Sequence, residues 1–147
     1  MFERTLLAGW SDMDFNSHMR NSAFLDKCSD VRMLYFAEHG LSSADFHALR
    51  IGPVVKKDEL EYFREVRLLE PLRVTLAGTG LSDDGSRFRL RNEVWRDDGQ
   101  LAARITSTGG WMDLAARKLI APPAALRDAM RALAATADFE VLPSSIK

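Results

Sequence analysis

Residues 21–39 read NSAFLDKCSDVRMLYFAEH, and their apolar positions recur with a helical period. The apolar stripe consists of Phe24, Cys28, Val31 and Tyr35. Successive members are four, three and four residues apart, and side chains at these spacings share one face of an α-helix. The segment therefore predicts a long helix whose apolar face must be buried against another element.

Both ends of this helix carry termination signals. Asn21 and Ser22 are the candidate caps at its start, because their side chains can accept hydrogen bonds from the unpaired N–H groups of the first turn. At the other end, His39 suits the negative end of the helix dipole, and Gly40 can adopt the left-handed conformation that closes a helix.

Strand patterns surround the helix. Residues 2–11 predict a first strand, and residues 41–50 predict a short helical connection. Extended structure restarts at residues 51–55, where Pro53 restricts the segment to a sheet edge or a strand start. Further strands are predicted at residues 57–69, 72–81, 87–96 and 101–112. Asp-Gly turn signals within residues 82–85 and 96–99 indicate that at least the last three of these strands form an antiparallel meander.

The chain closes with a second amphipathic pattern. Pro122 and Pro123 can open a helix that places Leu126, Met130 and Leu133 on one face. The whole order predicts one α+β domain over residues 1–147, in which an antiparallel sheet of five or six strands covers the long helix. The concave face of that sheet is the only apolar surface large enough to bury the helix.

The composition restricts the function. The 147 residues contain 20 Lys and Arg against 21 Asp and Glu, so the formal net charge is −1, and nucleic acid is not expected to be the main ligand. Cys28 is the only cysteine and there are three histidines, so we expect neither a disulfide nor a structural zinc site. A reducing cytoplasm fits this composition. No leader-like or membrane-spanning run is present, so membrane insertion is not expected.

The loop before the long helix carries a resemblance to a known family. Residues 12–25 read DMDFNSHMRNSAFL, which resembles the pattern D-x-D, then G-H-x-N-N, then Y-L of hot-dog fold acyl-CoA thioesterases. More narrowly, the chain is similar to the 4-hydroxybenzoyl-CoA thioesterase-like family. Residues 53–55, 67–72 and 95–102 extend the likeness, which covers about residues 5 to 115. The Leu-Leu-Glu-Pro stretch at 68–71 and the His-Met pair at 18–19 also resemble the thioesterase superfamily member 6-like branch.

Several positions depart from the family pattern. Ser17 stands where Gly is usual, Arg20 replaces the first Asn, and Phe24 replaces Tyr. Ser29 occupies a position where many relatives carry an acid, whereas the catalytic aspartate position is retained as Asp14. These departures affect the expected substrate and rate more than the expected fold.

The resemblance implies thioester hydrolysis and assigns roles to residues. Asp14 would act as general base or as nucleophile, two mechanisms between which the sequence does not decide. The backbone N–H groups of Asn21 and Ser22, at the positive end of the helix, would polarise the thioester carbonyl. The expected substrate-binding residues are His18, Asn21, Ser22, Phe24, Val54 and Val55. His18 could also orient a water or bond the backbone.

Plainer interpretations stand beside these. On loop statistics alone, acids such as Asp12 and Asp14 are more often turn formers, and we assign Asp12 mainly to holding the loop. Cys28 lies on the apolar stripe and is expected to pack rather than to react. The basic residues that could meet coenzyme A phosphates, or simply face solvent, are Lys56, Lys57, Arg87, Arg89, Arg91, Arg117 and Lys118.

The resemblance also implies an assembly. Two copies would join edge to edge, with Asp14 from one copy and the Val54–Val55 region from the other, so a homodimer or homotetramer is expected. No metal or redox cofactor is expected, and coenzyme A enters only as part of the substrate. One alternative is a dimeric hot-dog protein that binds acyl-CoA without cleaving it. A dehydratase acting on 3-hydroxyacyl thioesters ranks lower, because His18 lacks the Gly- and Pro-rich setting of such enzymes.

Overall fold

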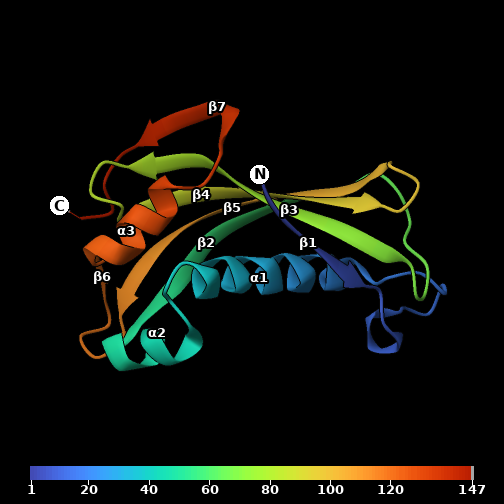
Figure 1. Ribbon diagram of the computed structural model, residues 1–147, viewed down its shortest axis with the longest axis horizontal. Helices are drawn as coiled ribbons and strands as arrows, with labels where there is room; N and C mark the ends of the chain where they lie inside the picture. The colour runs from blue at the N-terminus through green and yellow to red at the C-terminus, as the bar shows by residue number, and fades with distance from the viewer. Residues whose placement is uncertain (147) are drawn as a thin grey trace.

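The fold is built from a long N-terminal helix, a curved sheet and a short C-terminal helix, as seen in a computed structural model that describes residues 1–146 (Figure 1). In chain order the elements are β1 (Phe2–Leu7), the 3-10 helix η1 (Trp10–Asp12), α1 (Asn21–Glu38), α2 (Ser43–Leu49), β2 (Ile51–Tyr62), β3 (Pro71–Ser82), β4 (Arg87–Arg96), β5 (Leu101–Asp113), β6 (Lys118–Ile120), α3 (Ala124–Arg131) and β7 (Ala135–Leu142).

The sheet has the order β1-β3-β4-β5-β2, and every neighbouring pair on this path is antiparallel. Figure 1 shows α1 running along one face of the curved sheet, which is the arrangement expected for a hot-dog fold. The α+β prediction and the antiparallel β3-β4-β5 meander are thus confirmed. Because β2 is the last strand of this path, its outer backbone edge is free to pair with another chain.

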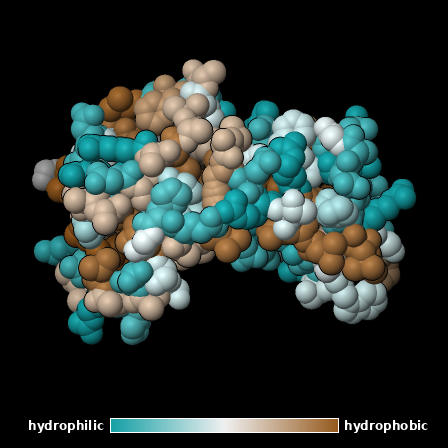
Figure 2. Space-filling model, in the orientation of Figure 1, coloured by the Kyte–Doolittle hydropathy of each residue, from teal (hydrophilic) through white to brown (hydrophobic). Residues whose placement is uncertain are grey.

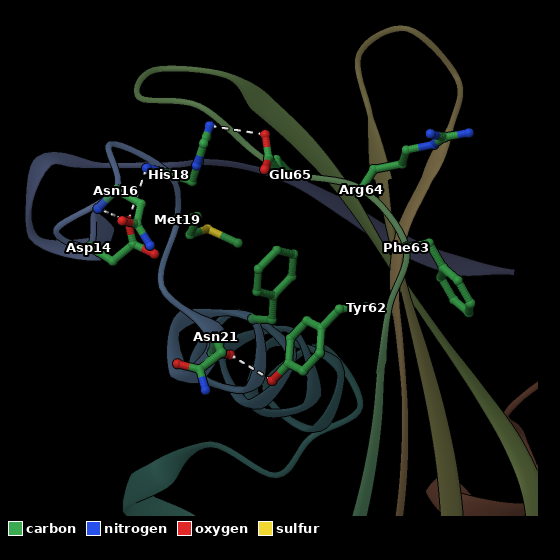
Figure 3. Close-up of a pocket in the computed structure, with 10 residues that line it drawn as sticks. Asp14, Asn16, His18, Met19, Asn21, Tyr62, Phe63, Arg64 and Glu65 are labelled. Atoms are coloured by element: carbon green, nitrogen blue, oxygen red, sulfur yellow. Dashed lines mark hydrogen bonds and ion pairs between the residues drawn. The ribbon is translucent and has the colours of Figure 1, made fainter.

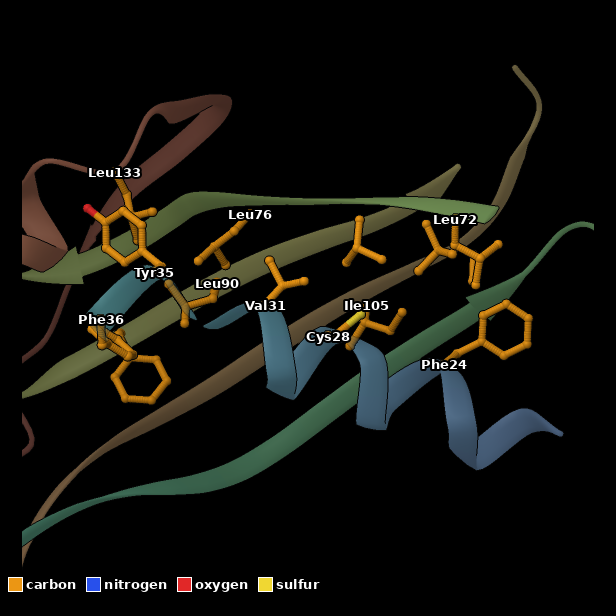
Figure 4. Close-up of a cluster of buried hydrophobic side chains, with 14 of the residues drawn as sticks. Phe24, Cys28, Val31, Tyr35, Phe36, Leu72, Leu76, Leu90, Ile105 and Leu133 are labelled. Atoms are coloured by element: carbon orange, nitrogen blue, oxygen red, sulfur yellow. The ribbon is translucent and has the colours of Figure 1, made fainter. Parts of the chain in front are cut away.

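The core lies between α1 and the concave face of the sheet. Phe24, Cys28, Val31 and Tyr35 are all buried, so the stripe identified in the sequence faces the sheet (Figure 4). Opposite them lie Leu72, Leu76, Leu90 and Ile105. Burying one large apolar side chain contributes about 1.5–3 kcal/mol, so this layer dominates the packing. Burial also raises the pKa of the Cys28 thiol to about 12, which keeps it protonated and unreactive.

Two predicted strand boundaries are wrong. The first strand ends at Leu7 rather than residue 11, because the chain turns at Gly9 into η1 and the Gly9 N–H donates to Asp12 Oδ2. The segments expected at 51–55 and 57–69 form one strand, β2, which ends at Tyr62. A register shift between Val55 and Lys57 lets the strand continue through the irregularity that divided the pattern.

The sheet is also larger than the five or six strands expected. β6 adds to β5, and β7 pairs in parallel with β3, giving seven strands. In β7, Asp138 pairs with Arg91 at 2.9 Å and Glu140 with Arg89 at 2.7 Å. The strand alternates polar and apolar residues, but Phe139 and Val141 stay 40% and 65% exposed, so β7 adds little to the core.

The helix ends agree in part with the prediction. Gly40 has φ +80°, the left-handed conformation expected after the last turn, and His39 Nδ1 lies 2.8 Å from the Tyr35 carbonyl oxygen. The start is corrected: Arg20 is the N-cap, and Asn21 and Ser22 already lie inside the helix. Neither of the two side chains caps the first turn.

The molecule is hollowed on one side. In the orientation of Figure 1, the space-filling view shows a concave outline beneath α1, between the end that carries α2 and the end that carries η1 (Figure 2). Among residues 1–146, no helix is both long enough and apolar enough to cross a membrane.

Candidate functional site

A pocket of about 370 Å³ opens where the loop before α1 meets the end of β2. Its lining residues are Asp14, Asn16, His18, Met19, Asn21, Phe24, Tyr62, Phe63, Arg64 and Glu65. Figure 3 shows the Asp14 loop on one side and Tyr62 on the other, with Asn21 at the start of the helix between them. Four of the residues singled out in the sequence, Asp14, His18, Asn21 and Phe24, therefore line one pocket.

The loop holds Asp14 by one carboxylate oxygen. Asp14 Oδ1 accepts the N–H of Asn16 at 2.8 Å and the N–H of His18 at 3.1 Å, while the backbone N–H of Asp14 donates to the His18 carbonyl at 2.8 Å. No donor from residues 1–146 bonds the second oxygen, Oδ2. The carboxylate is thus fixed in orientation and keeps one oxygen for a water or a substrate.

Ser17 gives this loop its turn. It has φ +67°, in the left-handed region where glycine is favoured, and its N–H bonds the Asp14 carbonyl at 3.3 Å. The conformation explains why Gly is the usual residue at this position, and it shows that the loop keeps the turn although Ser carries a Cβ. The departure noted in the sequence therefore does not change the path of the chain.

The start of α1 presents unpaired donors to the same pocket. The N–H of Ala23 bonds the Arg20 carbonyl, whereas no acceptor within residues 1–146 bonds the N–H groups of Asn21 and Ser22. Both groups lie at the positive end of the helix dipole. Asn21 lines the pocket, but Ser22 does not, and the Ser22 hydroxyl accepts Arg20 Nε at 3.0 Å.

Asp12, two residues before Asp14, is held differently. Its Oδ2 lies 2.7 Å from Lys27 Nζ and accepts the N–H of Gly9 at 2.8 Å, and both charged side chains are largely buried. Burial raises the pKa of Asp12, but the hydrogen bonds from Lys27 and Gly9 outweigh it, so the pKa lies below its ordinary value. Asp12 ties the loop to α1, which agrees with the structural role we assigned to it.

The opposite wall of the pocket comes from β2 and the loop after it. The Tyr62 hydroxyl donates to the Asn21 carbonyl at 3.1 Å, and the Tyr62 ring packs edge-on against buried Phe24 at 5.4 Å. His18 Nε2 lies 3.0 Å from Glu65 Oε2, which joins this loop to the Asp14 loop. Figure 3 shows Phe63 and Arg64 pointing away from Asp14.

Val54 and Val55 lie outside this pocket. Both belong to β2, and Val55 lines a second cavity between α1 and the sheet. Within one chain they are therefore not brought to Asp14.

Sequence reasoning missed the wall formed by residues 62–65. The prediction of a strand through residue 69 placed these residues inside a sheet, whereas the chain leaves the sheet after Tyr62. The aromatic pair at 62–63, next to the Arg-Glu pair at 64–65, was the available signal for a pocket wall. None of the seven basic candidates lines this pocket, and Arg89 and Arg91 are already paired with acids of β7.

The polar side chains of the pocket include two carboxylates, those of Asp14 and Glu65, and the imidazole of His18. In the described part of the chain, no three His, Cys, Asp or Glu side chains form a group that could hold a metal ion.

A model of the thioesterase-like superfamily matches residues 8–130. The fold is similar to the Staphylococcus aureus protein SAV2348, solved in complex with CoA, with a TM-score of 0.80 at 23% identity over 88% of this chain and 81% of that one. It is also similar to Slr0204, a 1,4-dihydroxy-2-naphthoyl-CoA thioesterase from Synechocystis, with a TM-score of 0.80 at 19% identity, covering 90% and 96% of the two chains.

A third structural relative is YbaW, a probable thioesterase from Escherichia coli, with a TM-score of 0.70 at 21% identity over 88% of this chain and 96% of that one. At such identities these structures establish the shared fold. No curated protein matches the sequence significantly.

Proposed function

Because the chain belongs to the thioesterase-like superfamily, we propose that it hydrolyses acyl-CoA thioesters to a carboxylic acid and free coenzyme A. One observation carries this proposal: a carboxylate with a free oxygen, on Asp14, shares a pocket with the unpaired N–H of Asn21 at the start of α1. Thioester hydrolysis needs these two elements, a base for water and a donor for the developing oxyanion.

In the proposed mechanism Asp14 Oδ2 removes a proton from a water, and the water oxygen attacks the thioester carbonyl carbon. The N–H group of Asn21 stabilises the oxyanion, and the C–S bond breaks as the thiolate leaves and is protonated. The hydrogen bonds to Oδ1 keep the carboxylate oriented throughout. Direct attack by Asp14 to form an anhydride is the alternative, and we favour the general base.

We also propose that two copies pair through β2. The exposed stretch of β2 from residue 56 to residue 61 begins with two basic residues, Lys56 and Lys57. It continues with three acidic residues, Asp58, Glu59 and Glu61. Antiparallel pairing of two copies places the basic half against the acidic half and protects both free edges. It also sets the Ile51 end of one strand beside the Tyr62 end of the other, so Val54 and Val55 of one copy approach the pocket of the second.

A thiol-release assay tests the activity. Short, long, branched and aromatic acyl-CoAs are offered to the purified protein, and release of free thiol from at least one class is expected. Binding of an acyl-CoA without thiol release would instead support the alternative of a non-catalytic acyl-CoA-binding protein. The single unpaired cysteine is consistent with a cytoplasmic location for this reaction.

Light scattering tests the assembly. We expect a dimer or a tetramer in solution. A stable monomer of 16.5 kDa that still hydrolyses its substrate would contradict a site completed by a second copy.

A further inference from the structure

A second cavity, of about 110 Å³, lies between the middle of α1 and the sheet. Its walls are mostly apolar and include Phe36, Phe88, Leu90 and Trp111. Its volume exceeds the ~10–15 Å³ needed for one water, so it has room for several non-hydrogen atoms. None of its lining residues lines the pocket that contains Asp14.

One wall of this apolar cavity carries a buried positive charge. Arg32 is only 8% exposed, its Nε donates to Asn92 Oδ1 at 2.9 Å, and its Nη2 donates to Ser107 Oγ at 2.7 Å. Within residues 1–146, Nη1 has no acceptor and the guanidinium has no directly contacting carboxylate. Asp58 attracts the guanidinium and is joined to it through Ser107, whose hydroxyl donates to Asp58 Oδ1, but no ion pair forms between the two side chains. A buried charge held by neutral partners favours an incoming anion.

A second donor on the same cavity is also unsatisfied. Trp111 is completely buried, and no acceptor in the described chain bonds its indole N–H. Its ring is held by stacking on Phe46 and by the edges of Phe36 and Phe88, so the indole cannot turn to find another partner. A buried donor without an acceptor is destabilising, and such groups are rare in folded proteins.

We propose that this cavity receives the far end of an acyl chain that carries a carboxylate, which Arg32 and Trp111 hold by hydrogen bonds. The inference rests on the proposed function and narrows it to acyl-CoA substrates with a second acid group. Apolar walls suit the methylene chain, and hydrogen-bond donors on two residues that line the cavity suit the terminal oxygens.

The cavity is accessible from the side where β2 is free. Ser29 is exposed, Met33 is 37% exposed and Val55 is 44% exposed, and all three line it. In the proposed pairing of two β2 strands, the Pro53–Val55 end of one copy lies beside the Tyr62 end of the other. An acyl chain whose thioester lies at Asp14 of one copy can therefore extend into this cavity of the second copy.

Matched substrates test the proposal. Adipoyl-CoA and suberoyl-CoA are compared with hexanoyl-CoA and octanoyl-CoA, which have the same chain lengths but end in a methyl group. We expect kcat/KM to be at least ~10-fold higher for the chain length whose carboxylate reaches Arg32, because a site built from buried donors rejects an analogue without the acceptor. Equal rates for both members of each pair would overturn the proposal while leaving thioester hydrolysis established.

Variants at Ser29 test whether the positive charge of Arg32 is responsible for the substrate preference. Residue 29 lies three positions before Arg32 on the same helix, so Ser29→Glu supplies a competing carboxylate to the guanidinium. We expect the acid-ended and the methyl-ended substrates then to have about equal kcat/KM values. Ser29→Gln, matched in size but uncharged, should keep the preference. Loss of the preference in both variants would show that bulk, not charge, is responsible and would contradict the role of Arg32.

A further variant tests the indole donor, and binding separates the two proposals. Trp111→Phe removes the N–H but keeps a ring in the aromatic cluster, so we expect the preference to fall about tenfold, the lower end for loss of one hydrogen bond to a charged group. Calorimetric titration of the wild-type protein with each CoA ester reports recognition without hydrolysis. Tighter binding of the acid-ended ester with no thiol release would support the cavity and overturn the proposed activity, and equal binding would overturn the cavity.

Discussion

The two ends of α1 are built in opposite ways. At the C-terminal end the aromatic rings of Tyr35, Phe36, Phe46 and Trp111 pack against one another with centroids within about 6 Å. At the N-terminal end the chain forms a polar loop, a pocket and two N–H groups without acceptors.

This difference shows how one helix can serve both stability and chemistry. Unpaired donors at a helix start are destabilising unless another part of the structure compensates. Packing at the far end and along the stripe fixes α1 on the sheet, so its first turn can stay open. Substitutions at the loop end should therefore change the reaction, and those at the aromatic end should change stability.

The strongest test of this division is Asp14→Asn. The Asn side chain can still accept the N–H groups of Asn16 and His18 but cannot act as a base, so we expect turnover to fall by ~10²–10⁴ at an unchanged melting temperature. Thiol release and a thermal melt on the same preparation measure both. Wild-type turnover would remove Asp14 from the mechanism.

At the aromatic end, Phe46→Ala should cost about 3–5 kcal/mol of unfolding free energy, because it opens a cavity against Trp111 and Phe36. Urea unfolding gives the value. The turnover of the remaining folded protein should stay close to that of the wild type. Leu49→Ala is the matched control, since Leu49 lies on the same short helix but is 46% exposed and should have a small effect.

Asp12→Ala tests whether the two acids of the loop differ in role, with Asp12 contributing to stability and Asp14 to the reaction. It leaves Lys27 without its partner and the Gly9 N–H without its acceptor, so we expect a loss of about 1–3 kcal/mol. Because the pKa of Asp12 is lowered in the folded state, the wild type keeps this contribution above its ordinary value of 3.8 and loses it as pH falls below that value. The difference between the two proteins should therefore shrink in acid unfolding curves.

The smallest expected effect is at Ser17. Ser17→Gly removes the Cβ from a residue with φ +67°, and the gain is partly offset by the greater freedom of glycine in the unfolded chain, so we expect a stabilisation below ~1 kcal/mol. Denaturant midpoints measure it. Ser17→Ala retains the Cβ and should not give the gain; an equal gain from both would mean that the turn is not strained.

The spacing of apolar residues along the sequence was sufficient to predict features that depend on residues close together in the chain. The stripe from Phe24 to Tyr35 predicted the buried face of α1. The resemblance to the family, and not the local pattern, pointed to Asp14, which lines one pocket with Asn21 at the helix start. Asn21 and Ser22 were misassigned as caps because cap propensity does not fix where the first turn begins, and here Arg20 takes that position.

The remaining features depend on contacts that are distant in sequence. β7 pairs with β3, and Asp138 and Glu140 on it bond arginines of β4 that lie 47 and 51 residues earlier, pairs that the local pattern of the strand does not reveal. Tyr62 becomes part of the site only because β2 ends there and its hydroxyl reaches Asn21. Arg32 and Trp111 likewise line one cavity only once α1 lies on the sheet.

The hydrogen bond from Tyr62 to the Asn21 carbonyl has a consequence for how the protein behaves at different concentrations. It fastens the outermost strand directly to the turn that would receive the thioester oxygen. If the Val54–Val55 region of a twin completes the pocket beside this turn, then separating the twins by dilution removes that wall, although β5 still holds β2 in place. Specific activity would then follow mass action, declining as the protein concentration drops below the dissociation constant of the pair.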